Sequence, residues 1–417
     1  MERLIFHIDV NSAFLSWEAA RRVERGEPDI RLIPAAIGGD RDKRTGVIVA
    51  KSIPAKKYGI KTGEPVAQAL RKCPELFLAR PDFRLYERNS AAFMDICRRY
   101  APVVEKYSID ECFLDMTGTG RIYPDPIAIA HTIKNTIRDE LGFTVNVGIG
   151  NCKLCAKMAS DFEKPDKVHT LFQQEIPKKM WPLPVGELFT VGQSTAQRLE
   201  KAGIHTIGNL ANRPRSAVQR IAGQKLGAQI HDYANGIDPS PVNAQREEAK
   251  GYSISTTLEK DVTTGSQADK ILLALSDSVS ARMRGDGVKA YCVAVSIRSN
   301  DFKTRSHQRK LELPTDISSE IYALCCQLFR ELWDGITPLR LLGISLTDLT
   351  RGEEIQASLF PDENREKARK LDKAMDAIRS KYGSGTLVRA SSVNDNLHVG
   401  KKYQAQLERI HEHKEEE

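Results

Sequence analysis

The sequence predicts an α+β protein of several modules, and three observations support this fold class. The chain has 417 residues, enough for about two to four domains of ordinary size. Up to residue 172 the expected elements follow the order strand, helix, strand pair, helix, strand, helix, strand. A Pro-rich break at 176–188 then precedes a small helical region and a second strand-rich module. We therefore expect a first module built on an antiparallel, ferredoxin-like sheet with helices on one face.

The first module opens with the apolar run LIFHIDV at 4–10, which is typical of a buried strand. A helix follows and stops at Gly26, so that Asp9 lies at the end of a core strand. Short strands and helices separated by Gly and Pro at 32–80 indicate a compact insertion. FTVNVGIG at 143–150 alternates apolar and polar residues, as a half-buried strand does.

The helical region after the break ends near 235–243, and residues 250–348 are again rich in strand patterns. Alternating strands and intervening helices are expected in this second module at 290–299, 338–349, 266–284 and 317–332. A last helix at about 364–381 carries one apolar stripe of Ala368, Leu371, Met375 and Ile378. The end of the chain is expected to be disordered.

Composition restricts the classes of function. Lys and Arg number 62 against 55 Asp and Glu, a net charge of +7 that is compatible with a polyanionic partner. The apolar run before His7 is too short for a signal peptide or a membrane span, so we expect a cytoplasmic protein. Eight scattered cysteines predict reduced thiols, and the single CxxC of Cys152 and Cys155 lacks a second pair for zinc.

Three carboxylates occur where apolar strands would normally exclude charge: Asp9, Asp110 and Glu111. Burying an unpaired carboxylate costs several kcal/mol, so each needs a cationic partner. A pair of Mg²⁺ ions is one such partner, because hard cations bind carboxylate oxygens. Adjacent strand residues point to opposite faces, so Asp110 and Glu111 converge only if the chain forms a hairpin at 108–112. The alternative is an ordinary solvated turn.

Three motifs carry a resemblance to a known family. HIDVNSAF (7–14), YSIDECFLD (107–115) and GIGNCKLCAKMASDFEKPD (148–166) resemble the palm motifs of Y-family translesion DNA polymerases. The similarity to bacterial polymerase IV and to the catalytic subunit of polymerase V extends over about residues 1–390. It implies template-directed nucleotidyl transfer on an architecture of palm, fingers, thumb and little finger.

The resemblance also assigns domains. It implies a palm at 1–31 and 81–174, fingers at 32–80, a helix-hairpin-helix thumb at 175–243, an α+β little finger at 244–350, and a tail with a clamp-binding motif at 351–417.

The palm motifs imply roles for individual residues. Asp9 and Asp110 would hold two Mg²⁺ ions, Glu111 would hold the ion at the primer 3′-hydroxyl, and the carbonyl of Val10 would complete a coordination shell. These three carboxylates would be the catalytic residues.

Nucleotide-binding residues follow from the same motifs. Phe14 matches the steric gate that excludes a 2′-hydroxyl, and the N–H groups of Ala13 and Phe14 at a helix start suit triphosphate oxygens. Lys56 and Lys164 match basic triphosphate contacts. Polymerase IV carries a Tyr and an Arg at the positions of Ile53 and Lys56, so the branch within the family stays open. For Phe14 the alternative is simple core packing.

Two regions are candidates for DNA contacts. The segment 188–211 resembles a helix-hairpin-helix whose turn at Gly192 offers N–H groups to a phosphate, although an ordinary helical hairpin is an equal alternative. Residues 282–310 carry eight basic side chains against two acidic ones. This charge indicates either a surface that binds the DNA backbone or an ordinary solvent-exposed face. The candidate contacts in the second module are Ser253, Ser255, Thr256, Arg298 and Arg305.

QASLF at 356–360 resembles the motif that binds the bacterial sliding clamp, the beta subunit of the replicative polymerase. Gln356 would anchor one end, while Leu359 and Phe360 would fill an apolar pocket. Five residues also match by chance, and no role is assigned to 361–417.

The sequence thus predicts a monomeric, error-prone DNA polymerase that acts on primer-template DNA and dNTPs during damage tolerance and repair, near the bacterial nucleoid. Two alternative functions are compatible with part of this pattern. A nucleotidyl cyclase also pairs carboxylates with two metals, but would not explain the thumb-like hairpin. A catalytically inactive clamp-binding adaptor would be expected to lack the three carboxylates that this chain retains.

Overall fold

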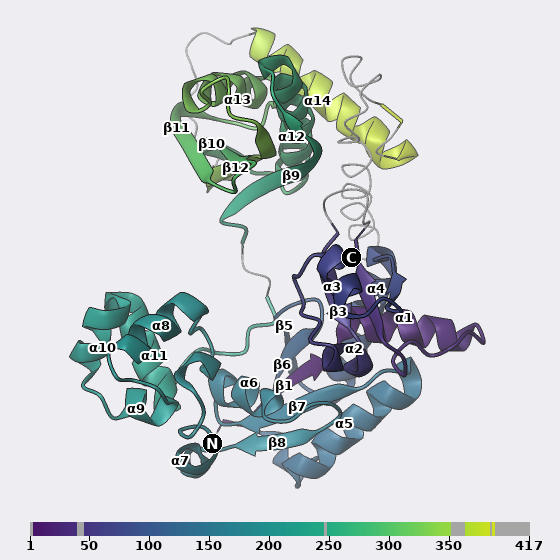
Figure 1. The fold of residues 1–417 in the computed structure, drawn as a ribbon, viewed down its shortest axis with the longest axis vertical. Coiled ribbons are helices and arrows are strands. Elements are labelled where there is room, and N and C mark those ends of the chain that lie inside the picture. Colours follow the sequence, from purple (N-terminus) through teal and green to yellow (C-terminus); the bar gives the residue numbers. More distant parts are fainter. Residues whose placement is uncertain (1–2, 40–45, 246–247, 352–362, 384–385, 388–417) are drawn as a thin grey trace. The chain divides into compact units, whose positions relative to one another are not determined.

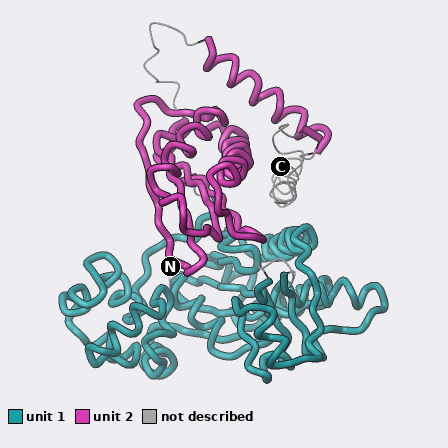
Figure 2. The backbone as a smooth tube through the Cα atoms, turned by 45° about the horizontal axis from the view of Figure 1, so that its top comes forward, with its two compact units in different colours: residues 1–40, 46–246 teal, residues 41–45, 247–417 magenta. Residues whose placement is uncertain are grey.

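The computed structural model describes residues 3–39, 46–245, 248–351, 363–383 and 386–387. The chain divides into two compact units, drawn in teal and magenta in Figure 2. The first comprises residues 1–40 and 46–246, and the second residues 41–45 and 247–417.

A five-stranded sheet forms the centre of the first unit (Figure 1). Its strand order is β5-β6-β1-β7-β8, and all neighbouring pairs are antiparallel except β7 and β8, which run parallel. The parallel pair arises because helix α6 connects β7 to β8, and parallel neighbours require such a crossover. The strands are β1 (Ile5–Val10), β5 (Val103–Lys106), β6 (Glu111–Asp115), β7 (Val145–Gly150) and β8 (Val168–Leu171).

Helices cover both faces of this sheet, so the prediction of helices on one face was wrong. Phe6 and Ile8 of β1 belong to the core formed with α4 (Phe83–Tyr100) and α5 (Pro126–Leu141). Between them His7 points to the other face, where its Nδ1 lies 2.8 Å from the Oγ of Ser160 on α6. Helix α6 (Lys153–Asp161) therefore packs against the second face.

A glycine explains why α6 can pack so closely. A Cβ placed on Gly148 of β7 would lie 1.9 Å from the carbonyl oxygen of Ala156 and 2.4 Å from the amide nitrogen of Ser160. The backbone of α6 thus occupies the volume that a side chain would need. The sequence alone does not show which helix packs against Gly148, because that contact depends on the tertiary structure.

The predicted hairpin at 108–112 is confirmed. Strands β5 and β6 pair antiparallel, and the N–H groups of Tyr107 and Ser108 both donate to the carbonyl of Glu111 over 3.1 Å. Asp110 lies in the turn and Glu111 begins β6.

The remaining elements of the first unit form a small sheet and a helical region. The sheet has the order β3-β2-β4, with β2 (Ala35–Gly38), β3 (Ile48–Lys51) and β4 (Phe77–Ala79). The helices near it are α1 (Ala13–Glu24), α2 (Ile53–Lys57) and α3 (Val66–Lys72). The helical region has α7 (Ile176–Lys179), α8 (Gln193–Lys201), α9 (Ile207–Ala211), α10 (Arg215–Ala222) and α11 (Gln224–Ala234). Single 3₁₀ turns are η2 (Thr119–Arg121), η3 (Gln173–Glu175) and η4 (Val185–Glu187).

The second unit contains an antiparallel sheet in the order β11-β10-β12-β9. Two helices pack on one face of it and form its core. The elements are β9 (Gly251–Val262), α12 (Gly265–Gly285), β10 (Lys289–Ser299), β11 (Thr304–Thr315), α13 (Ser318–Leu332) and β12 (Leu339–Thr350), followed by α14 (Glu363–Tyr382). The strands and helices expected in this module are confirmed.

Helix α14 packs on the second unit through charged side chains. Arg284 of α12 is buried and contacts Asp372 over 3.3 Å and Asp376 over 2.6 Å. The same oxygen of Asp372, Oδ2, also accepts a hydrogen bond of 2.7 Å from the backbone N–H of Ser318. Arg369 pairs with Asp316 at 3.0 Å. Of the apolar stripe expected from the sequence, Leu371 and Ile378 are exposed, whereas Ala368 and Met375 are half-buried.

Replacing Asp372 by Asn should release α14 from the second unit. Removing one partner of a buried ion pair costs about 3–5 kcal/mol, because the remaining charge of Arg284 loses much of its compensation. We expect amide hydrogen exchange in 363–382 to rise by more than about tenfold. The exposed pair of Lys370 and Glu366 provides the control, and Glu366→Gln should leave exchange unchanged. Equal protection in both variants would contradict an electrostatic anchor.

All eight cysteines are free, as expected from their spacing. Among the described residues no helix is both long enough and apolar enough to cross a membrane.

Candidate active site

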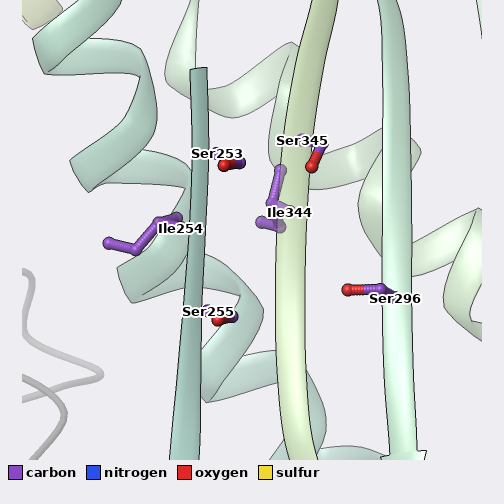
Figure 3. Close-up of a pocket in the computed structure, with 6 residues that line it drawn as sticks. All are labelled: Ser253, Ile254, Ser255, Ser296, Ile344 and Ser345. Carbon is purple, nitrogen blue, oxygen red and sulfur yellow. The ribbon is translucent and has the colours of Figure 1, made fainter. Parts of the chain in front are cut away.

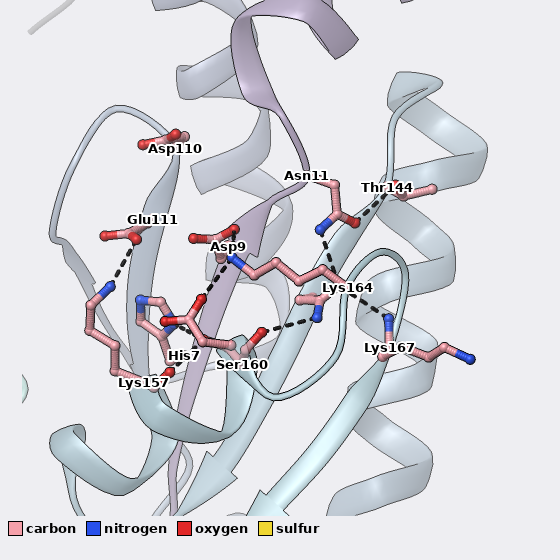
Figure 4. Close-up of polar contacts among 12 residues, drawn as sticks. His7, Asp9, Asn11, Asp110, Glu111, Thr144, Lys157, Ser160, Lys164 and Lys167 are labelled. Atoms are coloured by element: carbon pink, nitrogen blue, oxygen red, sulfur yellow. Dashed lines mark hydrogen bonds and ion pairs between the residues drawn. The ribbon is translucent and has the colours of Figure 1, made fainter. Parts of the chain in front are cut away.

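The three acidic residues singled out in the sequence lie at neighbouring strand ends (Figure 4). Asp9, near the end of β1, pairs across the sheet with Glu111 at the start of β6. The N–H of Val10 donates to the carbonyl of Asp110 over 3.0 Å, which places the hairpin turn beside the end of β1. The side chain of Asp9 shares the face of His7, the face that α6 covers.

Lysines from α6 and the loop after it pair with two of these carboxylates. The Nζ of Lys164 lies 2.8 Å from Asp9 Oδ1, and the Nζ of Lys157 lies 2.8 Å from Glu111 Oε1 (Figure 4). Asp110 instead accepts a hydrogen bond of 2.7 Å from the hydroxyl of Ser108. Lys157 was not singled out in the sequence, because its role depends on the register between β6 and α6.

Burial raises the pKa of Asp9 to about 7, with the neighbouring Lys164 opposing this change and Glu111 adding to it. A carboxyl group with such a pKa is poorly stabilised as an anion, so the site favours an additional cation. Carboxylate oxygens and a backbone carbonyl are the donors that Mg²⁺ prefers, and the residues present therefore fit this ion. Within the described ranges no three acidic, His or Cys side chains are already arranged as metal ligands.

Phe14 lies in the first turn of α1 and is half-buried in a group of aromatic rings. Its ring centroid is 4.6 Å from that of Tyr86 and 5.7 Å from that of Trp17. These contacts hold the ring in one place while part of it stays exposed. The N–H groups of Ala13 and Phe14 belong to the first turn of α1, where amides lack an intrahelical acceptor.

A buried asparagine supports the loop that carries Lys164. The Oδ1 of Asn146 accepts from Asn11 Nδ2 at 3.1 Å and from the N–H of Lys167 at 3.3 Å. Its Nδ2 donates to the carbonyl of Glu163 at 2.6 Å. Sequence reasoning missed this residue, because the alternation at 143–150 predicted a half-buried strand with Asn146 on its polar face. That prediction was wrong, since all six residues of β7 are buried, and a buried Asn needs hydrogen-bond partners.

The other predicted nucleotide and DNA contacts of the first unit are exposed. Lys56 lies on the short helix α2. Gly192 directly precedes α8, and a Cβ placed on it would meet no atom within 4 Å. The turn before it contains Thr190 in the left-handed region, with φ of 74°.

In the second unit serine hydroxyls line a shallow pocket on the sheet face without helices (Figure 3). Ser253 pairs with Ser345, and Gly343 lies between Ser255 and Ser296 in the neighbouring strands. A Cβ on Gly343 would lie 2.6 Å from Ser296 Oγ, so glycine keeps the pocket open. Ser296 and Ser345 were missed because only the cross-strand register brings them beside the predicted serines.

The strand register divides the predicted DNA contacts of the second unit between the two faces of the sheet. Arg298 shares the serine face, where its Nε donates to Thr304 over 2.9 Å. Thr256 pairs with the core residue Leu342 and lies on the helix-covered face. Arg305 pairs with the core residue Ile297, so it also belongs to the opposite face, although it is exposed. Strand alternation thus separates residues that one sequence region seemed to group.

The predicted clamp motif at 356–360 lies outside the described residues.

Comparisons with known proteins agree with this arrangement. Residues 8–161 match the impB/mucB/samB family and residues 249–359 its C-terminal domain. Residues 186–238 match a thumb domain described for DNA polymerase-iota.

Relatives match over nearly their whole length. DNA polymerase IV of Clostridium acetobutylicum is 44% identical over 391 residues, covering 94% of this chain and 98% of that protein. DNA polymerase IV 1 of Bacillus subtilis is 36% identical over 385 residues, covering 92% and 91%. A solved Y-family DNA polymerase chimera shares the fold, with a TM-score of 0.73 at 20% identity over 84% of this chain and 100% of that one.

Proposed function

Because this chain belongs to the DNA polymerase IV family and is a template-directed DNA polymerase of the translesion class, we propose that Asp9, Asp110 and Glu111 are its catalytic residues. Polymerases of this family generally depend on divalent metal ions, and we propose two Mg²⁺ ions here, held by the three carboxylates and the carbonyl of Val10. Such ions would activate the primer 3′-hydroxyl and neutralise the phosphates.

The pairing of Asp9 with Glu111 beside the hairpin turn is the observation that carries this proposal. Two buried or half-buried carboxylates at one strand end repel each other unless a cation lies between them. Lys157 and Lys164 supply positive charge from the α6 side. Asp110 lies in the adjoining turn, where its carboxylate accepts a hydrogen bond from the hydroxyl of Ser108.

The nucleotide would bind between the first turn of α1 and the loop after α6. The N–H groups of Ala13 and Phe14 suit phosphate oxygens, and Lys164 and Lys56 supply charge. Lys164 would exchange Asp9 for the triphosphate when the nucleotide binds. Asn146 supports this exchange by keeping the backbone of the Lys164 loop in place.

DNA contacts would come from both units. The turn at Gly192 offers backbone N–H groups to a phosphate, and the serine face of the second unit offers hydroxyls at Ser253 and Ser255, with Arg298 on the same face. Thr256 and Arg305 are not part of this proposed surface, because the register places them on the other face. Binding through phosphates should weaken steeply with salt.

Primer extension tests the function directly. Purified protein with primer-template DNA, Mg²⁺ and dNTPs should add nucleotides, and omission of the metal should stop the addition. Failure of the wild-type protein to extend any primer would refute the assignment.

We also propose that residues 356–360 bind the sliding clamp. Deleting them should abolish binding to the clamp in a pull-down with purified beta subunit while leaving unaided primer extension within about twofold. Gln356→Ala should weaken the binding in the same direction. Retained clamp binding after the deletion would contradict this role.

Replacing Phe14 by Ala should relax the exclusion of ribonucleotides. A steric clash costs about 1–3 kcal/mol, so discrimination between dNTP and rNTP should fall by about fivefold to 150-fold. Single-nucleotide incorporation kinetics measure this ratio. The ring centroids of Phe83 and Phe14 lie 6.4 Å apart, so Phe83→Leu is the control for the loss of aromatic packing around Phe14. Unchanged discrimination in Phe14→Ala would remove the gate role.

A further inference from the structure

Lys157 has an unusually enclosed position for a lysine. It lies on α6 and is only 9% exposed, and its Nζ contacts Glu111 Oε1 over 2.8 Å. Burying an ammonium group is unfavourable unless other groups stabilise its charge. The ion pair engages Oε1, one of the two carboxylate oxygens of Glu111.

Two aromatic rings complete the surroundings of Lys157. Its Nζ lies 5.4 Å from the ring centroid of Tyr107 and 5.4 Å from that of Phe189. The two rings contact each other edge to face, with centroids 6.4 Å apart. A cation between aromatic faces is attracted to both, so this arrangement fixes the direction of the lysine side chain.

The two rings come from different parts of the first unit. Tyr107 begins the turn that leads to Glu111, and its N–H donates to the carbonyl of that residue over 3.1 Å. Phe189 belongs to the segment before α8 and stacks on Tyr233 of α11. Phe189 therefore connects the helical region to the palm-like sheet through Lys157.

The backbone next to Phe189 is strained. Thr190 has φ of 74°, a conformation that is costly for a β-branched residue. Such strain persists only where surrounding contacts maintain it. The contacts that Phe189 makes with Lys157 and Tyr233 hold the residue next to Thr190 in place.

We infer that Lys157 is a positioning residue for the Glu111 carboxylate, and that Phe189 holds Lys157 in place and so couples the turn before α8 to the metal-binding edge of the sheet. The inference rests on the proposed function, because Glu111 is a ligand only if the three carboxylates bind metal. Through these contacts the position of the helical region affects the orientation of the Glu111 carboxylate.

The direction of the effect separates positioning from simple charge. Removing a positive charge near a cation site would by itself strengthen cation binding. Removing a group that orients a ligand weakens it, typically by tenfold or more for a hydrogen-bonding partner of a metal ligand. A positioning role for Lys157 therefore predicts weaker metal binding, the opposite of the electrostatic expectation.

Binding of Mn²⁺ to the full-length protein in complex with primer-template DNA, followed by electron paramagnetic resonance, tests this inference. Lys157→Met should weaken Mn²⁺ binding by about tenfold. Phe189→Leu, which keeps the ion pair but removes the ring, should weaken it by about threefold. Lys157→Arg should restore binding to within about threefold of the wild type, since guanidinium also pairs with carboxylates and stacks on rings.

Lys153 offers a matched control on the same helix. Its Nζ pairs with Glu105 over 2.6 Å and lies 4.8 Å from the Phe113 ring centroid, so Lys153 has an ion pair and a ring contact like those of Lys157 but with a different carboxylate. Lys153→Met should leave Mn²⁺ binding unchanged. In a Glu111→Gln background Lys157→Met should have no further effect, because it acts through that carboxylate.

Unchanged or tighter Mn²⁺ binding in Lys157→Met would overturn the inference, and so would an equal loss in Lys153→Met. An additional loss in the Glu111→Gln background would also contradict it. If the wild-type protein extends primers and binds Mn²⁺ but Lys157→Met binds it normally, only this inference fails. If the wild type neither extends primers nor binds Mn²⁺, the proposed function fails.

Discussion

Asp9→Asn should abolish primer extension, with a decrease of at least about 10³-fold in the incorporation rate. Metal ions in such sites contribute several kcal/mol of transition-state stabilisation, and each 1.36 kcal/mol corresponds to about tenfold in rate. Asp9 pairs with Glu111 across the sheet and contacts Lys164. Replacing its carboxylate by an amide therefore removes a negative charge at the point where the proposed nucleotide and metal sites meet. Single-turnover kinetics with Mg²⁺ and one dNTP measure the decrease.

The same variant should be as stable as the wild type or more stable at pH 8. Burial raises the pKa of Asp9 to about 7, which means that the folded protein disfavours its ionised form. The amide removes this cost, and Lys164 keeps its second contact, to Asp161 at 2.8 Å. Thermal melting and DNA binding at low salt are the controls. A variant that unfolds, or that extends primers normally, would contradict the proposed role.

The pH dependence of stability has a defined sign. With a folded pKa of about 7 and an ordinary value of 3.8, Asp9 keeps its proton in the folded state while the unfolded chain has lost it. The free energy of unfolding of the metal-free protein should therefore decrease as the pH rises from about 4 to 7 and change little above that. Asp9→Asn should show a smaller decrease over this range.

Gly148→Ala should be the most destabilising small substitution in the first unit. The new Cβ would lie 1.9 Å from the carbonyl oxygen of Ala156, and neither the strand nor α6 can give way without losing packing. Overpacking against backbone costs more than the usual 1–3 kcal/mol, and we expect about 4 kcal/mol or more. Circular dichroism should show a melting temperature that is lower by at least about 8 °C.

Gly265→Ala provides the control for this prediction. Gly265 begins α12, and a Cβ there would meet no atom within 4 Å. Alanine is favoured over glycine in helices, so stability should be unchanged or slightly higher. If Gly148→Ala were equally stable, the close packing of α6 on β7 would be refuted. Because α6 carries Lys157, Gly148→Ala should also lower activity.

Local patterns were enough for most of the fold. The order of strands and helices and the elements of the second unit follow from periodicity and from turn-forming residues. The hairpin before Glu111 was expected because two adjacent carboxylates converge only at a turn. Helix α14 was also expected from its apolar spacing, but the face it buries was not. Asp372 and Arg379 are buried because they meet charged partners on α12, and no pattern within α14 contains that information.

For the candidate site, the sequence by itself determined the three carboxylates, because acidic residues inside apolar strand sequence are conspicuous wherever the strand lies. Only the tertiary structure decided what surrounds them. The lysine partner of Glu111, the asparagine behind the Lys164 loop and the separation of Thr256 from Ser253 depend on strand register and on the close approach of helices. These contacts join residues far apart in the chain, and a shift of one residue in register would reverse every face on which they depend.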